Sequence, residues 1–175
     1  MKITETGILD LVIIEPKVFS DSRGYFFEPY NKKKFDQNFG ITNFVQDNES
    51  KSRKGVLRGF HFQKPPYDQA KLVRCIEGQV LDVALDLRKQ SKTYGKYEKV
   101  ILSADNKKQF FIPRGFAHAF LVLSETAVFS YKVDNIYAPK YDSGIAWNDQ
   151  SLLVDWGLHE SQLIISEKDK NLSFL

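Results

Sequence analysis

Apolar and polar residues alternate with a period of two along much of the chain, as in β-strands with one buried face. The segment QVLDVALDL is one example, whose two faces carry Leu81, Val83, Leu85 and Leu87 on one side and Val80, Asp82, Ala84 and Asp86 on the other. The segment AVFSYKVD repeats the pattern, with one face made of Ala127, Phe129, Tyr131 and Val133. These segments predict strands that lie against a core.

Short turn signals separate further segments of the same kind. KLVRCIEGQ and KVILSADNKKQFFIP read as strands joined through EG and ADNKK turns, and SDSRG reads as a turn between LVIIEPKVF and YFFEPY. Helical periodicity is weak, and only NKKKFDQNFG and NDQSLLVDW are candidates for short helices. Many short strands at this spacing predict an all-β sandwich or barrel, closed so that its edges are protected, formed by residues 1–175 as a single domain.

Composition limits the classes of function. The net charge is only +3, with Lys and Arg spread among 22 acidic residues, whereas nucleic-acid binders usually carry a basic stripe. The run NKKKF is therefore expected to be a solvated face. No stretch of about 18 apolar residues is present, so no membrane span is expected. Glu5 and Asp10 interrupt the apolar N-terminal run, which argues against a signal peptide, and the single Cys75 fits a reducing compartment. We expect a cytoplasmic protein.

Several polar residues lie in phase with apolar faces, where a barrel would direct them into its interior. Tyr131 is in phase with Phe129 and Val133, and Lys71 and His118 occupy equivalent positions in their own segments. In GVLRGFHFQ a straight strand would place Arg58 and His61 on opposite faces. Gly59 between them could host a β-bulge that re-aims one of these side chains.

Each of these residues alone has an ordinary structural interpretation. A strand histidine is often a hydrogen-bonded core residue, a tyrosine can be a packed aromatic, and a lysine can extend to solvent. Together, however, His, Tyr, Lys and Arg are the set that acid–base chemistry on an anionic carbonyl substrate requires. The pattern therefore favours a catalytic site inside the barrel.

Four longer segments carry a family resemblance. FVQDNESKSRKGVLRGFHFQ, QAKLVRCIEGQVLDVALDLR, FIPRGFAHAF and YKVDNIYAPKYDSGIAWND resemble, in order, the dTDP-4-dehydrorhamnose 3,5-epimerase family of dTDP-L-rhamnose biosynthesis. The similarity runs from about residue 9 to about residue 169. It implies a cupin jelly-roll fold, a dTDP-4-keto-6-deoxy sugar substrate, no cofactor and no metal. It also implies a homodimer in which N-terminal strands pair with the sheet of the partner.

The resemblance also implies a role for individual residues. His61 matches the general base, Tyr131 the general acid, and Asp169 the carboxylate that pairs with the base. Lys71 matches the catalytic lysine beside the sugar, and Tyr137 the aromatic residue that stacks on thymine. The other positions that match contacts to the nucleotide sugar are Arg23, Glu28, Gln46, Asn48, Arg58, His118, Asp142 and Lys168. Asp142 stands where the family commonly has Glu, which weakens the case for a substrate contact at this position.

Three alternatives accompany this reading. A metal-dependent cupin would carry an H-x-H pair, but here the second position is Gln63, which leaves too few ligands for a tight site. A sugar-binding cupin without catalysis would have no use for His61, Tyr131, Lys71 and Asp169 together. A 3- or 5-monoepimerase, or a ketoisomerase acting on a related dTDP-4-keto sugar, stays open because it would use the same nucleotide-sugar fold. Single and double epimerisation differ only in how the sugar and Tyr131 are placed.

Overall fold

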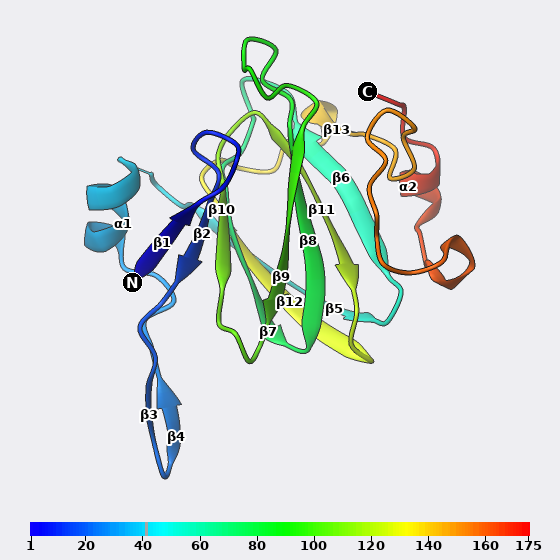
Figure 1. Ribbon diagram of the computed structural model, residues 1–175. Helices are drawn as coiled ribbons and strands as arrows, with labels where there is room; N and C mark the ends of the chain where they lie inside the picture. Colours follow the sequence, from blue (N-terminus) through cyan, green and yellow to red (C-terminus); the bar gives the residue numbers. More distant parts are fainter. Residues whose placement is uncertain (41) are drawn as a thin grey trace.

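Two antiparallel β-sheets pack face to face and form the body of the molecule (Figure 1). The computed structural model describes residues 1–40 and 42–175. The first sheet has six strands in the order β1-β2-β10-β7-β12-β5, and the second has five strands in the order β13-β6-β11-β8-β9. This arrangement confirms the predicted all-β fold with few short helices.

Many of the strands lie in the predicted segments, but LVIIEPKVF divides into two strands, and the strands Lys2–Glu5, Gln46–Arg53 and Asp142–Gly144 were not predicted. The bounds of the strands are β1 Lys2–Glu5, β2 Val12–Glu15, β3 Phe19–Asp21, β4 Gly24–Phe26, β5 Gln46–Arg53, β6 Leu57–Gln63, β7 Lys71–Glu77, β8 Gln79–Asp86, β9 Tyr97–Ser103, β10 Gln109–Ile112, β11 Phe116–Val122, β12 Thr126–Val133 and β13 Asp142–Gly144. The helices are α1 Lys32–Phe39 and α2 Glu167–Lys170, with 3₁₀ turns at Pro139–Tyr141 and Glu160–Gln162.

The main core lies between the two sheets, where the alternating pattern directs one face of each strand. Val73 of β7 and Phe129 of β12 meet Ala84 of β8 and Phe120 of β11 in this layer. The burial of these side chains is the largest favourable contribution to folding. The same inward phase carries Lys71, His118 and Tyr131, so the strand pattern correctly predicted which way these polar residues point.

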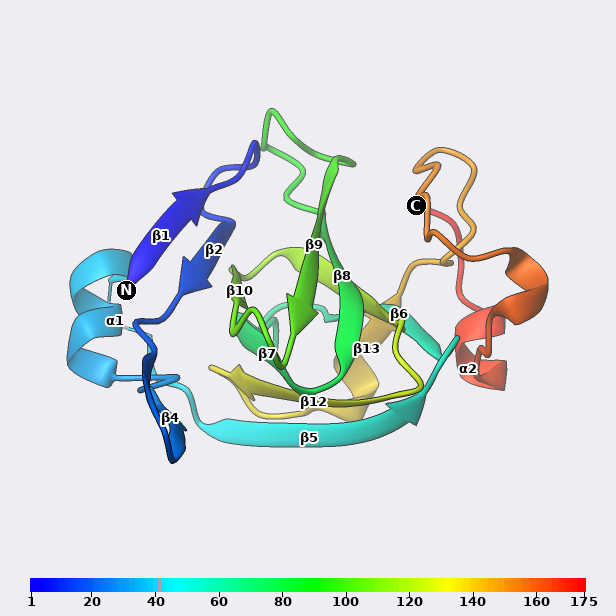
Figure 2. The same ribbon diagram turned by 60° about the horizontal axis from the view of Figure 1, so that its bottom comes forward.

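The five-stranded sheet is also covered on its outer face. Val83 and Leu85 of β8 and Leu121 of β11 pack there against Leu152 and Trp156 of the C-terminal segment. Figure 2 shows this segment beside β6, on the side of the sandwich opposite to α1. Strands β8 and β11 are consequently buried on both faces, which explains why both faces of QVLDVALDL are rich in apolar residues.

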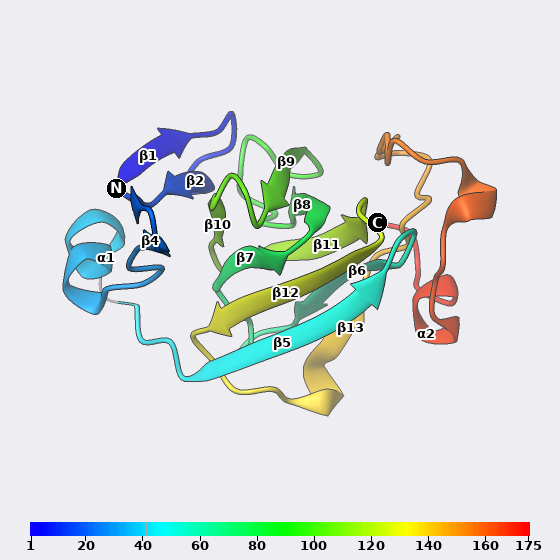
Figure 3. The same ribbon diagram turned by 90° about the horizontal axis from the view of Figure 1, so that it is seen from below.

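Helix α1 covers part of the outer face of the six-stranded sheet. Asn31 caps its N-terminus by accepting from the backbone N–H of Lys34, and Phe35 packs on Leu72 and Phe111 of the sheet. This confirms the helix predicted in NKKKFDQNFG. Figure 3 shows α1 and α2 on opposite sides of the sandwich.

The second helix predicted from the sequence, in NDQSLLVDW, is wrong. Residues 148–152 form turns and 153–156 form a loop, because the Asp149 carboxylate accepts from the N–H and Oγ of Ser151 and from the N–H of Leu175. Short polar side chains that bond nearby backbone in this way compete with helix formation. The helix near the C-terminus is α2 instead, capped by Ser166, whose side chain accepts from the N–H of Asp169.

The turn predicted at SDSRG closes a separate two-stranded hairpin of β3 and β4. This hairpin extends away from the sandwich (Figure 1). Its aromatic side chains Phe19, Tyr25 and Phe26 are each more than half exposed. None of the helices in residues 1–40 and 42–175 has the length and apolar character needed to cross a membrane.

Candidate active site

A β-bulge in β6 places two candidate site residues on the same face. His118 of β11 pairs with His61, but Phe120, two residues later, pairs with Arg58, so β6 holds one extra residue at this point. Gly59 has φ +112°, and a Cβ there would lie 2.4 Å from the carbonyl oxygen of His118. Glycine is therefore required at this position. Leu57 and Phe60 pack into the outer core, while Arg58 and His61 point away from it, as the sequence suggested.

Most of the predicted site residues line one cavity of about 300 Å³ between the sheets. Its walls include the predicted residues Gln46, Asn48, His61, Lys71, Tyr131, Tyr137, Asp142 and Lys168. They come from β5, β6, β7, β12, β13, α2 and the loop before β13. Residues far apart in sequence thus meet at one end of the sandwich.

His61 is held by a buried carboxylate. Its Nε2 lies 2.7 Å from Oδ1 of Asp169 in α2, and Asp169 is only 3% exposed. Burial raises the pKa of the Asp169 carboxyl, but bonds from His61, the Gly59 N–H and Ser166 outweigh it, so the net shift is downward. An ionised carboxylate can only accept hydrogen bonds, so Nε2 of His61 donates to it, and in the neutral imidazole Nδ1 is then the nitrogen with the free lone pair. The pair has the form of a histidine base oriented by an acid.

Lys71 is buried in the wall of the cavity at 8% exposure. Its Nζ donates to the backbone carbonyl of His61 at 3.3 Å. Burial lowers the pKa of the Lys71 ammonium to about 8, although the carboxylates of Asp82 and Asp142 oppose this shift. A cation so placed can stabilise negative charge that develops near His61.

Tyr131 lies on β12 of the six-stranded sheet, whereas His61 lies on β6 of the five-stranded sheet. Both side chains line the same cavity, so they approach it from opposite walls. Burial raises the pKa of the Tyr131 phenol, and nearby Arg58 reduces this shift. The phenol therefore keeps its proton at neutral pH. Arg58 donates to Oγ of Ser52 on β5, which fixes its guanidinium on the Tyr131 side.

Like Arg58, His118 does not line this cavity. Its Nε2 lies 3.0 and 2.9 Å from the two carboxylate oxygens of Asp82, and both residues are buried. Burial lowers the pKa of His118 and raises that of Asp82. Asp82 is a site residue without a predicted role, although it lies in phase with Val80 and Ala84. An acid on an apolar strand face was the signal that could have found it.

A cluster of polar side chains forms the rim of the cavity. The hydroxyl of Tyr137 donates to Oδ2 of Asp142 at 3.1 Å, and Nζ of Lys168 bonds the same oxygen. On the opposite wall, Nε2 of Gln46 donates to Oδ1 of Asn48 at 2.8 Å. The Asp142 carboxylate, shorter than the Glu common in the resembled family, is thus occupied by two neighbouring side chains.

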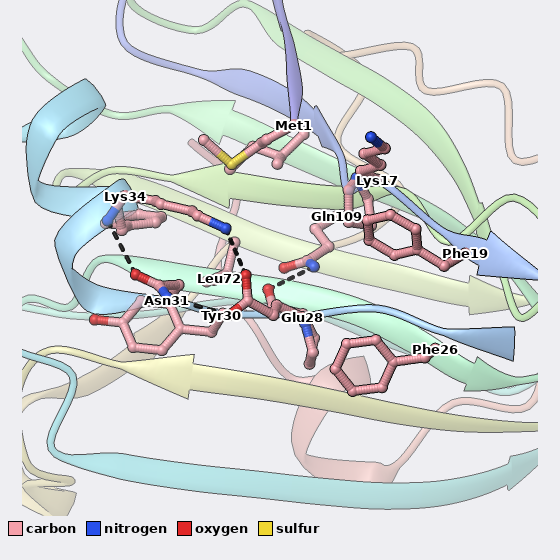
Figure 4. Close-up of a pocket in the computed structure, with 14 residues that line it drawn as sticks. Met1, Lys17, Phe19, Phe26, Glu28, Tyr30, Asn31, Lys34, Leu72 and Gln109 are labelled. Carbon is pink, nitrogen blue, oxygen red and sulfur yellow. Dashed lines mark hydrogen bonds and ion pairs between the residues drawn. The ribbon is translucent and has the colours of Figure 1, made fainter.

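Two further predicted residues, Arg23 and Glu28, belong to other parts of the chain. Arg23 lies at the tip of the β3–β4 hairpin, exposed and paired with Asp21. Glu28 lines a different pocket beside α1, where its carboxylate accepts from Lys34 and Asn31 (Figure 4). That pocket also includes Phe19 and Phe26 of the hairpin and Gln109 of β10, which donates to the carbonyl of Pro29. The expected grouping of Arg23 and Glu28 with His61 does not occur in the single chain.

The cavity combines a base, an acid and a cation in positions suited to proton transfer next to a carbonyl group. No group of three or more His, Cys, Asp or Glu side chains in residues 1–40 and 42–175 is arranged to hold a metal ion. The position that a metal-dependent cupin would give to a second histidine holds Gln63, whose buried amide bonds backbone groups instead.

Comparison with known proteins identifies the family of this chain. The family model described as dTDP-4-dehydrorhamnose 3,5-epimerase matches residues 5–175. The chain belongs to this family. The dTDP-4-dehydrorhamnose 3,5-epimerase of Escherichia coli K12 is 52% identical over 173 residues, which cover 98% of this chain and 93% of the relative. The resemblance read from the sequence is confirmed.

Solved structures of the family match the fold over nearly the whole chain. The dTDP-4-dehydrorhamnose 3,5-epimerase of Elizabethkingia anophelis has a TM-score of 0.96 and 55% identity, covering 99% of this chain and 96% of that one. The 3,5-epimerase of Legionella pneumophila, solved in complex with dTDP-4-keto-L-rhamnose, has a TM-score of 0.95 and 46% identity, with coverage of 99% and 92%. The two-sheet sandwich is therefore the epimerase family fold.

Proposed function

We propose that the protein epimerises C3 and C5 of dTDP-4-dehydro-6-deoxy-D-glucose to give dTDP-4-dehydro-L-rhamnose, a step of dTDP-L-rhamnose biosynthesis. Family membership over residues 5–175 supports the reaction class. The observation that carries the mechanism is the cavity itself, where the His61–Asp169 pair and Tyr131 enter from opposite sheets beside Lys71. An inversion requires a base on one face of the sugar and an acid on the other.

The first step removes a proton from a carbon next to the C4 ketone. Nδ1 of His61 takes the proton from C3 or C5, and the electrons of the C–H bond form an enolate whose oxygen is O4. Asp169 holds the imidazole in the tautomer that leaves this nitrogen free and stabilises the imidazolium that forms. The C4 ketone makes both carbons acidic, so one base can serve both positions in turn.

The second step needs a stabiliser for the charge on O4. Lys71 is the buried cation beside His61, and donors of this kind are commonly worth about 3–4 kcal/mol of transition-state stabilisation. Tyr131 then donates the phenol proton to the opposite face of the same carbon, which inverts the centre. Proton transfer from solvent restores the phenol, while His61 releases its proton.

The remaining residues suit the nucleotide. Arg58 can bind diphosphate oxygens bidentately through its guanidinium, and Tyr137 at the rim presents a half-exposed ring for stacking on thymine. Gln46 and Asn48 supply amides on the β5 wall. Asp142 and Lys168 bond to each other beside Tyr137, so we assign them to the orientation of this rim.

We further propose that the active form is a homodimer in which each hairpin reaches the cavity of the other chain. Three observations support this: the hairpin leaves the sandwich, its aromatic side chains are exposed, and Arg23 and Glu28 lie away from His61 (Figure 1). Exposed aromatic patches of this kind are typical of interaction surfaces. A second Arg from the partner would complete the binding of the diphosphate.

Catalysis in this mechanism uses no metal ion. The amide of Gln63 is already bonded to three backbone groups where a metal site would need a ligand. We therefore expect full turnover after exhaustive dialysis against EDTA. A loss of turnover that a divalent cation restores would contradict the mechanism.

One experiment tests the reaction. The protein is incubated with dTDP-4-dehydro-6-deoxy-D-glucose in heavy water, and the deuterium atoms in the product are counted and located by mass spectrometry and NMR. Epimerisation at both centres is expected to place one deuterium at C3 and one at C5. A single labelled and inverted carbon would identify a 3- or 5-monoepimerase, and movement of the carbonyl group would identify a ketoisomerase.

A further inference from the structure

Gln63 is the last residue of β6 and lies two residues beyond His61 on the same face of the strand. It is 5% exposed, and every hydrogen-bonding group of its side-chain amide is used. Nε2 donates to the carbonyl oxygens of Tyr67 at 2.7 Å and Ile136 at 3.1 Å, while Oε1 accepts from the N–H of Ala138 at 2.6 Å. The mechanism above gives this residue no role.

Two of these three bonds flank Tyr137. Ile136 precedes it and Ala138 follows it, so the Gln63 amide holds the backbone on both sides of the ring. The hydroxyl of Tyr137 bonds Asp142, and Asp142 pairs with Gln63 across β13 and β6. Tyr137 is thus fixed at its backbone and at its hydroxyl, although its ring is 53% exposed.

Only an amide can make this set of bonds. It supplies two N–H donors for two carbonyl groups and one oxygen acceptor for an N–H, whereas a carboxylate has no donor and would face two carbonyl oxygens. Buried polar groups that lose their partners are costly, so the three bonds strongly favour one position of the loop.

We propose that Gln63 is a positioning residue that holds Tyr137 over the mouth of the cavity and thereby sets the affinity for the nucleoside diphosphate end of the substrate. This inference rests on the proposed function, because that function assigns Tyr137 to the thymine base. Gln63 acts through the loop and does not itself touch the reacting carbons.

A double-mutant cycle tests the inference. The variants are Gln63→Met, Tyr137→Ala and the combination, with the dissociation constant of dTDP measured by calorimetry and kcat and KM by turnover. Tyr137→Ala is expected to weaken dTDP binding by about 5- to 150-fold, the value of one stacked base. Gln63→Met is expected to weaken it about 3- to 10-fold, through loss of loop order, with kcat changed little.

The combination decides how Gln63 acts. If Gln63 works through Tyr137, the double variant binds dTDP no more weakly than Tyr137→Ala alone, since the ring that Gln63 positions is already absent. Multiplying effects would overturn the inference. A lower melting temperature with unchanged dTDP affinity would also overturn it, because Gln63 would then serve stability only. A fall in kcat at constant KM would place Gln63 in the chemistry at His61 instead.

A measurement on the unaltered protein covers the case in which Gln63→Met does not fold. The Ala138 N–H lies outside regular secondary structure, yet its bond to Gln63 should slow its exchange with solvent at least about tenfold relative to an unstructured peptide. Exchange at the unprotected rate would overturn the inference. Failure of the proposed function gives a different result, in which the unaltered protein does not bind dTDP.

Discussion

His61 and Tyr131 have opposite roles in one inversion, so their variants should fail differently. His61→Ala should abolish epimerisation and also abolish exchange of the C3 and C5 protons with solvent, because no enolate forms. Tyr131→Phe should still form the enolate and allow reprotonation from the face that lost the proton. We expect its epimer formation to fall by about 10²- to 10⁴-fold, the usual contribution of a positioned acid.

Deuterium wash-in, followed by NMR beside product formation, measures both rates in one sample. Tyr131→Phe should incorporate deuterium without inversion faster than it makes product. Equal loss of exchange in both variants, with both proteins folded by circular dichroism, would show that the base and the acid are not divided in this way.

Lys71 should make the rate of proton exchange fall at high pH. Burial lowers the pKa of its ammonium to about 8, and only the charged form stabilises the enolate. On the alkaline limb of the pH–rate profile, exchange of the C3 and C5 protons should therefore slow as the pH rises through about 8, where Lys71 loses its charge. Wash-in rates between pH 6.5 and pH 10 measure this limb.

The same profile in Tyr131→Phe serves as its control. Burial raises the pKa of the Tyr131 phenol, so its ionisation belongs at higher pH, and a limb caused by Lys71 should persist when the phenol is removed. Disappearance of the limb in Tyr131→Phe would assign it to the phenol and contradict the role of Lys71.

Some of the site residues could be predicted from the alternation of apolar and polar positions in their strands, and others could not. Strand phase alone predicted that Lys71, His118 and Tyr131 point inward, because a period of two relates each to apolar neighbours. The same criterion applied to Asp82 would have predicted that it also points inward, where it contacts His118. Asp169 had no such signal. Its contact with His61 joins residues 108 positions apart, and only the family resemblance placed it there.

At the scale of elements, the bulge in β6 should be intolerant of any side chain at its glycine. Gly59→Ala would add a Cβ 2.4 Å from the carbonyl oxygen of His118, at a φ of +112°. We expect a loss of about 2 kcal/mol or more of unfolding free energy, and reduced activity because β6 must shift and carry His61 with it.

Gly157→Ala is a matched control for this change. Gly157 also has a positive φ, +73°, but a Cβ there would meet nothing within 4 Å. It should lose stability through backbone strain alone, by about 1 kcal/mol, and keep its activity. Urea denaturation and turnover measure both variants. Equal losses in the two would mean that the close approach of β11 does not matter.

Several elements could be predicted from the residues of their own segments. The strands β7, β8 and β12 were predicted from the alternation in their segments, and α1 was one of two short segments with weak helical periodicity. The prediction of a helix over residues 148–156 is wrong because the Asp149 carboxylate holds turns there. It accepts hydrogen bonds from Ser151 and from the backbone N–H of Leu175. A contact across that distance in the chain leaves no trace in local periodicity. Helix α2 was not predicted because its four residues are too few to show helical periodicity.

At the scale of the whole molecule, the proposed dimer predicts the mass in solution. The β3–β4 hairpin exposes Phe19, Tyr25 and Phe26, which a monomer would leave in water. Light scattering at micromolar concentration should give twice the mass of one chain. A monomeric mass with full activity would exclude the dimer.

A mixture of two impaired variants tests whether the hairpin of one chain contributes to the site of its partner. In a dimer that exchanges hairpins, the site of each chain uses its own His61 and the Arg23 of the other chain. The His61→Ala dimer should be inactive because no enolate forms, and the Arg23→Ala dimer should be only weakly active because the diphosphate loses a guanidinium. When the two are unfolded together and refolded, about half of the dimers are mixed, and one of the two sites in each mixed dimer is intact. Activity should therefore return to about a quarter of that of the unaltered protein. If Arg23 served its own chain, each site of a mixed dimer would carry one defect. Refolding the mixture would then restore nothing beyond the sum of the two variants.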